Sequence, residues 1–408
     1  MSRADVVVVG GGPAGCAAAI SLARAGRGVT LVDKATFPRD KCCGDGLTTA
    51  ALRELEALGL DPGAVPSWTA VGAAWVRSPS GRTVGFPLPH GQGVFAAIAP
   101  RAELDAALLD VARAVGVKVH DGHRFSGAAT VHDDRITLDV DGLGPIEARY
   151  AIAADGMWSP LRKALGLATP GYLGEWHAFR QYVDGVTGPA RDRLWVWFEP
   201  DLLPGYAWSF PLPDGRVNLG FGVRRGGARQ GDELARIWSE LRSRPHIAEA
   251  LGPHVAAHGP HKAWPIPARA DRAILSGGGG RVLLVGDAAC ATDPLTGEGI
   301  GQALLTGRLA ADAISRAGAT EPAAAAARYR VGVAREWLAD HRMASMLSSV
   351  IRHPLGTRVA VRVAGSTAWT RRCFARWLFE DEPRAAALTP LRWHRQFLAR
   401  PGAYTRGA

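Results

Sequence analysis

Four residues near the start of the chain have the types and spacing of a nucleotide-binding turn. Gly10, Gly12 and Gly15 follow a run of β-branched residues, and Asp33 ends the next apolar run. In such a strand–turn–helix unit, the first glycine makes the tight turn and the second lets the backbone approach a pyrophosphate. The third lets helix and strand pack closely. The helix offers free N–H groups to the phosphates and the acid accepts from a ribose hydroxyl, so the pattern predicts a dinucleotide-binding site.

Two later segments repeat the arrangement of a buried strand that ends in a turn. One leads into Asp155 and Gly156, and the other into Gly286 and Asp287, with a long helix beginning near Gly297. Asp287 can bind the ribityl hydroxyls of a flavin, and the partial positive charge at the start of the helix favours the anion that a reduced flavin becomes. NAD needs no second and third site of this kind, whereas FAD does. The three turns together predict FAD.

The elements that must position these turns follow from the hydrophobic periodicity. Strand-like apolar runs alternate with helical patterns around the three turns, whereas residues 179–223 have the alternation of short antiparallel strands. We expect an α/β protein with a Rossmann-like FAD-binding domain, an inserted antiparallel β-sheet domain that binds the substrate, and a helical C-terminal region. The expected bounds are 1–70, 100–175 and 270–320 for the first, 71–99 and 176–269 for the second, and 321–408 for the third.

Composition narrows the class of protein. The 408 residues are 47% hydrophobic and 21% charged, as in a globular protein. No run of 18 apolar residues occurs and the first strand starts at Ala4, so we expect neither a membrane span nor a signal peptide. The five cysteines have no framework spacing, which predicts a reduced, cytoplasmic protein, and the sequence has no metal-binding pattern.

The net charge of +10 is almost wholly arginine and is unevenly placed. The last 80 residues carry many arginines together with Trp337, Trp369, Trp377 and Trp393. Such a surface suits nucleic acid, an anionic membrane or solvent alone. Because no nucleic-acid-binding motif occurs, we expect no nucleic-acid partner, and peripheral contact with the inner face of the plasma membrane is our hypothesis.

Three motifs together resemble the FAD domain of the flavoprotein hydroxylase superfamily. They are GGGPAG at 10–15, ADGxxSxxR at 154–162 and GDAAxxxxPxxGEGIG at 286–301. Three segments are similar to the geranylgeranyl reductase family within it, namely PRDKxCGDGL at 38–47, GYAWSFP at 205–211 and DPLTGEGI at 293–300. The resemblance covers roughly residues 4–320, and the doubled Cys42–Cys43 departs from the family's usual single cysteine.

The resemblance implies which residues hold the flavin. Arg101 resembles the superfamily's flavin-contacting arginine, and the loop from Pro38 to Leu47 is expected between flavin and substrate. The implied FAD-binding residues are Gly10, Gly12, Pro13, Ala14, Gly15, Asp33, Lys34, Cys43, Gly44, Arg101, Asp155, Gly286, Asp287, Gly297, Gly299 and Ile300.

The resemblance also implies a reaction. Geranylgeranyl reductases use reduced FAD to saturate isolated alkenes of prenyl chains, which implies a prenyl-lipid substrate here, with NADPH or reduced ferredoxin as the external electron donor. An unactivated alkene needs a proton as well as a hydride, with the charge stabilised by nearby π faces. Tyr206 and Trp208 suit this role, and Cys43 is a candidate proton donor because a thiol is a neutral acid that tolerates apolar surroundings.

Alternatives remain for the aromatic residues, for the cysteine and for the reaction. The expected lining of an apolar substrate channel is Tyr206, Trp208, Phe210, Trp195 and Trp197. These residues could instead fill a core, and Cys43 could be a small residue packed against the flavin ring. The alternative reaction is that of an FAD-dependent monooxygenase or a halogenase-like enzyme acting on an aromatic natural product. A halogenase is disfavoured because its WxWxIP signature is replaced at 206–211. A third hypothesis is a non-catalytic flavin-binding membrane adaptor. The sequence leaves both a monomer and a dimer open.

Overall fold

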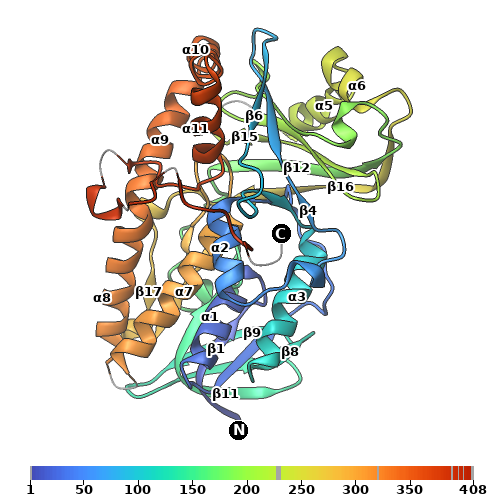
Figure 1. The fold of residues 1–408 in the computed structure, drawn as a ribbon. Helices are drawn as coiled ribbons and strands as arrows, with labels where there is room; N and C mark the ends of the chain where they lie inside the picture. Colours follow the sequence, from blue (N-terminus) through green and yellow to red (C-terminus); the bar gives the residue numbers. More distant parts are fainter. Residues whose placement is uncertain are drawn as a thin grey trace.

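Two sheets, stacked along the long axis of the molecule, organise the fold (Figure 1). The computed structural model describes residues 2–226, 231–318, 321–386, 389–393, 395–397 and 399–405. The first sheet lies at the end that holds the N-terminus, and the second lies at the opposite end. A long C-terminal helical segment runs beside both. This arrangement confirms the predicted α/β class with an inserted antiparallel sheet and a helical C-terminal region.

The first sheet is the Rossmann-like one. Its strand order is β17-β18-β11-β1-β2-β8, with β10 and β9 added beyond β11. The pairs β18–β11, β11–β1, β1–β2 and β2–β8 are parallel, and the valines of β1 are buried because helices cover both faces. The strands are β1 (Ser2–Val9), β2 (Val29–Asp33), β8 (Lys118–Asp121), β9 (Phe125–Val131), β10 (Ile136–Val140), β11 (Gly144–Ala153), β17 (Ser276–Gly277) and β18 (Val282–Leu284).

The helices of the first domain place the three turns. α1 begins directly after the first glycine turn and α7 directly after the third. The two helices touch where a Cβ on Gly307 would lie 2.2 Å from the Ala14 carbonyl oxygen, so only glycine permits this packing. The helices are α1 (Pro13–Arg24), α2 (Thr49–Ala57), α3 (Arg101–Ala114), α4 (Pro160–Ala164) and α7 (Ile300–Ala317).

The second sheet forms one wall of the site. Its order is β16-β12-β15-β14-β13-β5-β6, and every pair is antiparallel except β13–β5. Its strands are β5 (Ala73–Arg77), β6 (Thr83–Pro87), β12 (Trp176–Asp184), β13 (Leu194–Trp197), β14 (Tyr206–Pro211), β15 (Val217–Arg224) and β16 (Ala256–Ile266). Helices α5 (Gly231–Leu241) and α6 (Pro245–Leu251) cover its outer face. A small sheet of β3 (Gly46–Leu47), β7 (Ala97–Ile98) and β4 (Thr69–Ala70) lies between the two large ones.

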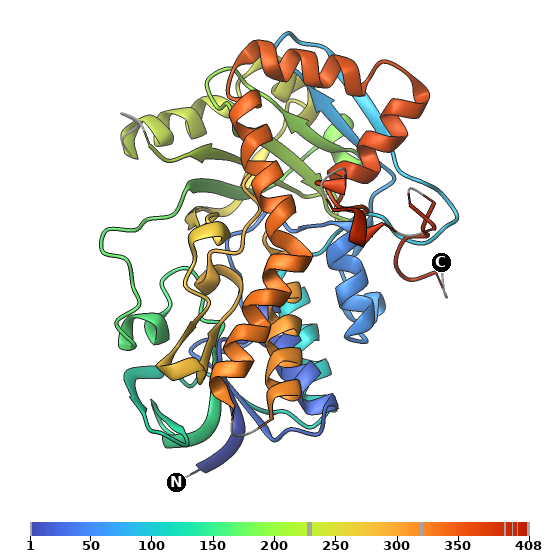
Figure 2. The ribbon, with the colours of Figure 1, turned by 90° about the vertical axis from the view of Figure 1, so that its left-hand side faces the viewer.

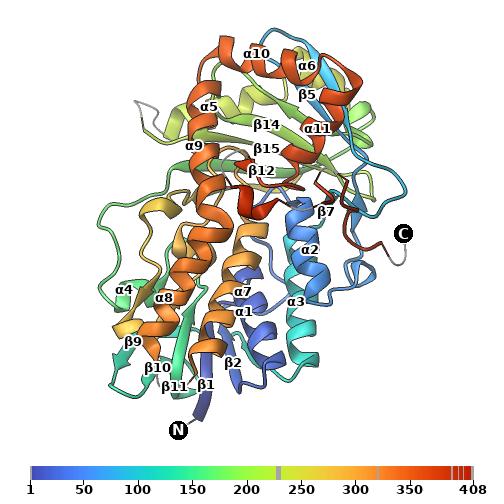
Figure 3. The same ribbon diagram turned by 60° about the vertical axis from the view of Figure 1, so that its left-hand side comes forward.

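The C-terminal helices connect the two sheets (Figure 2). In Figure 3, α8 and α9 follow one another along the side of the molecule, α10 crosses the end remote from the N-terminus, and α11 returns toward the middle. They are α8 (Pro322–Val333), α9 (Ala339–Ile351), α10 (Pro354–Ala364) and α11 (Ala368–Leu378), and a π-helical turn at Ala334–Leu338 joins the first two. In the described part of the chain, no helix combines the length and the apolar composition needed to cross a bilayer.

Candidate active site

A cavity of about 970 Å³ lies between the two sheets, at the upper end of the range for small-molecule sites. Every residue expected to bind FAD lines it except Gly15. Gly15 instead packs against the backbone of Gly10, because a Cβ at position 15 would lie 1.8 Å from the Gly10 carbonyl oxygen. The packing role is the one that the spacing assigned to the third glycine.

Gly10 and Gly12 border the cavity for different reasons. Gly10 has a φ of +110°, and a Cβ on it would lie 2.2 Å from the Ala154 carbonyl oxygen. Gly12 has ordinary extended backbone, and the nearest atoms to a Cβ there are guanidinium nitrogens of Arg39 and Arg101, at 3.6 and 3.8 Å. A side chain at position 12 would therefore occupy the cavity and leave the protein packing unchanged.

Two arginines, Arg101 and Arg39, face this turn, and only Arg101 was predicted from the motifs. Arg101 donates from Nε and Nη2 to the two carboxylate oxygens of Asp105, at 2.7 and 2.6 Å. Arg39 Nη1 lies 3.0 Å from Asp105 Oδ2. Burial disfavours the charge on Arg101, but Asp105 outweighs it and raises the arginine's pKa above its usual value. Two cations against one carboxylate leave a net positive charge beside Gly12, which suits a pyrophosphate.

Asp33 and Asp287 lie at the ends of parallel strands, on the edge that faces the cavity. Asp33 accepts from the backbone N–H groups of Gly11 and Ala35, at 2.7 and 2.8 Å, which fixes its carboxylate at the end of β2. Asp287 forms an ion pair with Lys41, with Nζ and Oδ2 3.0 Å apart. Lys41 therefore ties the loop from Pro38 to Leu47 to the third turn.

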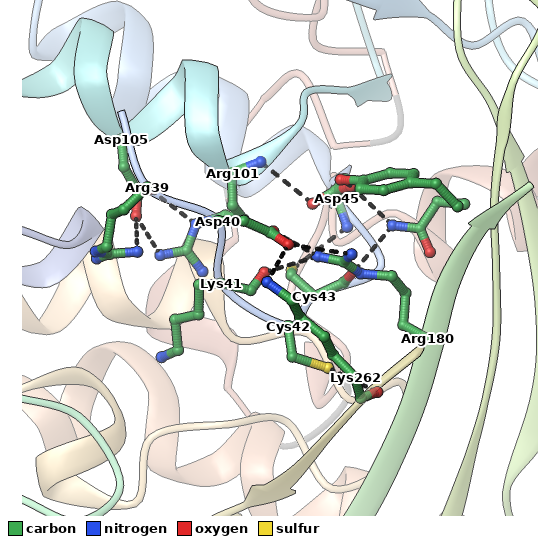
Figure 4. A network of polar contacts seen from close by, with 12 residues as sticks. Arg39, Asp40, Lys41, Cys42, Cys43, Asp45, Arg101, Asp105, Arg180 and Lys262 are labelled. Carbon is green, nitrogen blue, oxygen red and sulfur yellow. Dashed lines mark hydrogen bonds and ion pairs between the residues drawn. The ribbon is translucent and has the colours of Figure 1, made fainter. Parts of the chain in front are cut away.

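A second ion-pair cluster holds the same loop against the second sheet (Figure 4). Asp40 accepts from Arg180 on β12 and from Lys262 on β16, both at 2.6 Å. Arg180 also donates from Nε to the Cys43 carbonyl oxygen at 3.2 Å. The backbone of Cys43 is therefore positioned by a nearly fully buried guanidinium from the opposite sheet.

Both cysteines of the doubled pair line the cavity as thiols. Burial raises the pKa of Cys43 to about 11, and the nearby Asp45 carboxylate acts in the same direction. Burial likewise raises the pKa of Cys42 to about 12. They differ in their partners: Cys42 Sγ donates to the Lys262 carbonyl oxygen at 3.5 Å, while Cys43 Sγ accepts from the Asp45 N–H at 3.3 Å. Accepting that bond leaves the Cys43 proton free for another acceptor.

Asp45, to which no motif assigned a role, is the centre of a buried network. Its carboxylate accepts from Tyr182 Oη at 2.5 Å, from Asn218 Nδ2 at 2.7 Å and from the Arg101 N–H at 3.2 Å. Asn218 also donates to the Cys43 carbonyl oxygen at 2.9 Å. Burial raises the pKa of Asp45 to about 6 despite these hydrogen bonds. A buried carboxylate that titrates near neutrality is typical of functional sites.

The pH dependence of stability should report Asp45. Because burial raises its pKa from 3.8 to about 6, the carboxyl releases its proton more easily in the unfolded chain. Its contribution to stability is complete below about pH 4 and is lost as the pH rises through about 6, a total on the order of 3 kcal/mol. Asp45→Asn should remove this slope, measured as the free energy of unfolding of the holoenzyme between about pH 4 and 7.

Tyr182→Phe is the matched variant for this test. The phenol donates to the carboxylate and lowers the pKa of Asp45 against the effect of burial. Its loss should therefore move the sensitive pH range upward while the carboxyl remains. A wild-type minus Asp45→Asn difference that does not change with pH contradicts the assignment.

One face of β14 forms the aromatic wall of the cavity. Tyr206, Trp208 and Phe210 all line it, as their alternation along the strand predicts. Trp208 donates from Nε1 to Asn218 Oδ1 at 3.0 Å, and its ring lies where a Cβ on Gly220 would come within 2.3 Å. The indole is thereby fixed between the Asp45 network and the cavity.

Trp195 and Trp197 do not line the cavity, and the prediction for them is wrong. In the pairing of β13 with β14, Val196 lies opposite Trp208, whereas Trp195 lies opposite Ser209. Opposite residues of a sheet point to the same face, so Val196 reaches the cavity with Trp208. The two tryptophans point the other way, stacked 5.6 Å apart in the core beneath α5 and α6.

The far wall of the cavity comes from the C-terminal helices, which no motif predicted to line the site. Apolar side chains of α9, α10 and α11 close the side opposite the aromatic wall: Leu347, Ile351, Ala360, Val361, Phe374, Trp377 and Leu378, with Phe379 just beyond. The apolar periodicity of residues 341–379 was the available signal, but the family motifs end before it. The cavity therefore has a polar half near the glycine turns and an apolar half under these helices.

A buried acidic cluster links the C-terminal chain to the third turn. Arg384 pairs with Asp293 at 2.5 Å and with Glu380 at 3.2 Å. Glu298 lines the cavity beside Gly297, and burial, reinforced by Glu380, raises its pKa to about 8. Burial and the neighbouring Glu380 thus both favour the protonated form of Glu298 at the start of α7.

Comparison with known proteins identifies the family. The model of the FAD binding domain matches residues 3–306. Menaquinone reductase from Mycolicibacterium smegmatis is 36% identical over 354 residues, which cover 78% of each chain. The chain belongs to the geranylgeranyl reductase family of FAD-dependent oxidoreductases. Digeranylgeranylglycerophospholipid reductase 2 from Methanopyrus kandleri is 31% identical over 333 residues, 77% of each chain.

Solved structures share the fold of this family member. A geranylgeranyl bacteriochlorophyll reductase-like protein from Thermoplasma acidophilum superposes with a TM-score of 0.79 at 20% identity, over 96% of this chain and 99% of that one. A halogenase in complex with FAD superposes with a TM-score of 0.70 at 18% identity, over 95% and 86%. At these identities the likeness extends to the fold alone.

The residues present fit FAD. The open space in front of Gly12, with Arg39 and Arg101 beside it, would hold the pyrophosphate. Asp33 would accept from the ribose, and Asp287 would bind the ribityl chain. The protein is an FAD-dependent oxidoreductase of the geranylgeranyl reductase and menaquinone reductase type.

Proposed function

We propose that this reductase saturates carbon–carbon double bonds in the prenyl chain of a lipid. The observation that carries the proposal is the apolar half of the cavity, which lies between the aromatic wall of β14 and the side chains of α9, α10 and α11. Cys43 lies in the same cavity, near the flavin-binding turns. An apolar cavity with few orienting polar groups suits a hydrocarbon chain.

The proposed reaction adds one hydride and one proton across the alkene. FAD, when bound and reduced, supplies the hydride, and its external donor is proposed to be NADPH or reduced ferredoxin. Cys43 gives the proton on Sγ to the second alkene carbon, for which its high pKa keeps it ready as a neutral thiol. The faces of Tyr206 and Trp208 stabilise the positive charge that develops before the proton and hydride have both arrived. The thiolate then takes a proton from solvent, because burial disfavours its charge.

The names of the relatives give two kinds of prenyl lipid to test. The relatives at 36% identity are named menaquinone reductase, and four at 29–32% are named digeranylgeranylglycerophospholipid reductase. We propose a quinone that carries a polyprenyl chain as the first substrate to try. The test is to mix photoreduced holoenzyme with this lipid without oxygen and follow flavin reoxidation. Because the quinone ring also accepts two electrons and two protons, the extracted lipid is reoxidised to the quinone before mass spectrometry. A product that is still two hydrogens heavier, with the added hydrogens in the prenyl fragment, supports the proposal. Reoxidation that needs oxygen and gives a hydroxylated or halogenated aromatic product supports the alternative enzyme class instead.

Substrate affinity should rise with prenyl chain length. Each buried methylene contributes roughly 0.8 kcal/mol, and apolar side chains of α9, α10 and α11 line the half of the cavity away from the glycine turns. A twenty-carbon prenyl alcohol should therefore oxidise the reduced flavin at far lower concentration than five- and ten-carbon analogues, measured as KM in detergent. Equal KM values for short and long analogues contradict a prenyl substrate.

A further inference from the structure

Helix α10 has a second apolar face, which points to solvent. Leu355, Val359 and Val363 are 70%, 51% and 61% exposed. They recur every fourth residue, so they form one stripe along the helix. Thr357 and Val361 lie on the other face and are buried.

The neighbouring helices α9 and α11 carry further exposed apolar residues. Met346 and Val350 on α9 and Trp369 on α11 are each more than half exposed. We call these three residues, together with Leu355, Val359 and Val363, the docking face. It lies around α10, at the end of the molecule remote from the N-terminus (Figure 3). Exposed apolar clusters of this kind mark interaction sites.

The segment that carries the docking face is rich in positive charge. Residues 341–379 contain seven arginines and no aspartate or glutamate. Arg352, Arg358 and Arg362 are exposed. In the described part of the chain, the ion pairs formed by arginines after residue 340 all come from three others, Arg376, Arg384 and Arg392. The three exposed arginines are available for an external anion.

The same helices connect the docking face to the cavity. Ala360 and Val361 of α10 line the apolar half of the cavity, as do Leu347 and Ile351 of α9. The docking face and the proposed prenyl site are thus opposite sides of the same helices. A molecule bound at this face lies one helix away from the reacting site.

We propose that the docking face binds the surface of an anionic lipid bilayer, so that the prenyl chain passes from the bilayer, beside α10, into the cavity. Its apolar side chains enter the boundary between headgroups and acyl chains while the arginines pair with lipid phosphates. A two-fold dimer through this face would set arginines against their own copies with no acid between them. Nucleic acid would leave the apolar stripe unpaired. Delivery of a prenyl chain to the cavity rests on the proposed prenyl substrate. Binding of the docking face to the bilayer does not depend on that substrate.

The test compares two triple variants with the same change in charge. The first is Arg352→Gln, Arg358→Gln and Arg362→Gln at the docking face. The control is Arg328→Gln, Arg330→Gln and Arg335→Gln on α8 and the turn after it, which are exposed and lie toward the other end of the molecule. Both holoenzymes are sedimented with vesicles of phosphatidylglycerol and phosphatidylcholine in equal parts, over a series of salt concentrations.

Wild-type and control should bind these vesicles at low salt and release as salt rises. The first variant should bind roughly fivefold more weakly per arginine, on the order of 100-fold in all. It should keep its flavin and its turnover of a short prenyl analogue in solution, and lose turnover of a long-chain substrate held in vesicles. Equal losses in both variants overturn the docking face. So does a wild-type that binds no vesicles, or one whose face instead forms a dimer by analytical ultracentrifugation. Failure of prenyl turnover with intact vesicle binding overturns the proposed substrate alone.

Discussion

The Gly12→Val variant should fold normally and purify without the yellow colour of the flavin. Position 12 has backbone angles that any residue adopts, and no protein atom lies within 3.6 Å of a Cβ there. The added side chain points into the space that the pyrophosphate needs. Overpacking costs about 1–3 kcal/mol, and the lost phosphate contacts add to it, so FAD affinity should fall at least roughly 100-fold. Flavin absorbance per chain, with circular dichroism for the fold, measures both parts.

Another glycine of the same turn and a smaller substitution at Gly12 supply the controls. Gly15→Val should fail to fold, because a Cβ there would lie 1.8 Å from a backbone carbonyl oxygen. Gly12→Ala should lose less flavin than Gly12→Val, because its side chain is smaller. If Gly12→Val retains a full complement of flavin, the pyrophosphate does not lie against this turn and the site has been assigned wrongly.

The Cys43→Ser variant should keep its flavin spectrum and lose most of its turnover. A general acid typically contributes 10²–10⁴-fold, and a serine hydroxyl is a far weaker acid than a thiol. The loop backbone should stay in place, because Arg180 and Asn218 bind the carbonyl of residue 43 rather than its side chain. The expected result is a loss of roughly 100-fold or more in the rate of flavin reoxidation by the prenyl substrate.

Cys42→Ser is the matched control, since Cys42 also lines the cavity but donates its proton to the Lys262 carbonyl oxygen. It should reduce the rate only slightly. If the rate of flavin reoxidation in Cys43→Ser lies within about threefold of wild type, the loss is far smaller than the contribution of a general acid. Cys43 then has a packing role. A larger loss for Cys42→Ser than for Cys43→Ser means that the other member of the pair is the proton donor.

Motif spacing predicted the flavin half of the site, because each turn depends on local backbone geometry. Gly10, Gly12, Asp33 and Asp287 line one cavity in the structure, although they lie in different segments of the chain. Backbone geometry of this kind depends on residues that are adjacent in the sequence, so it can be predicted without knowing the fold.

The substrate half could be predicted only in part, because it depends on contacts between distant segments. The alternation along β13 shows that Trp195 and Val196 face opposite ways, but only the pairing with β14 decides which of them meets Trp208. The network around Asp45 has the same origin, since its partners lie on β12, β15 and α3. The spacing of residues along the chain does not predict such contacts.

The position of the C-terminal helices in the cavity wall has a consequence for biosynthesis. The residues that match the FAD domain end at 306, whereas the far wall of the cavity comes from residues 347–379. A chain emerging from the ribosome folds from its N-terminal part first. The residues of the cofactor site are therefore all present before the C-terminal helices form the far wall of the cavity. Flavin can bind while that side of the cavity is still open. The last helices then add the apolar wall of the substrate half next to a flavin site whose residues all precede them in the chain.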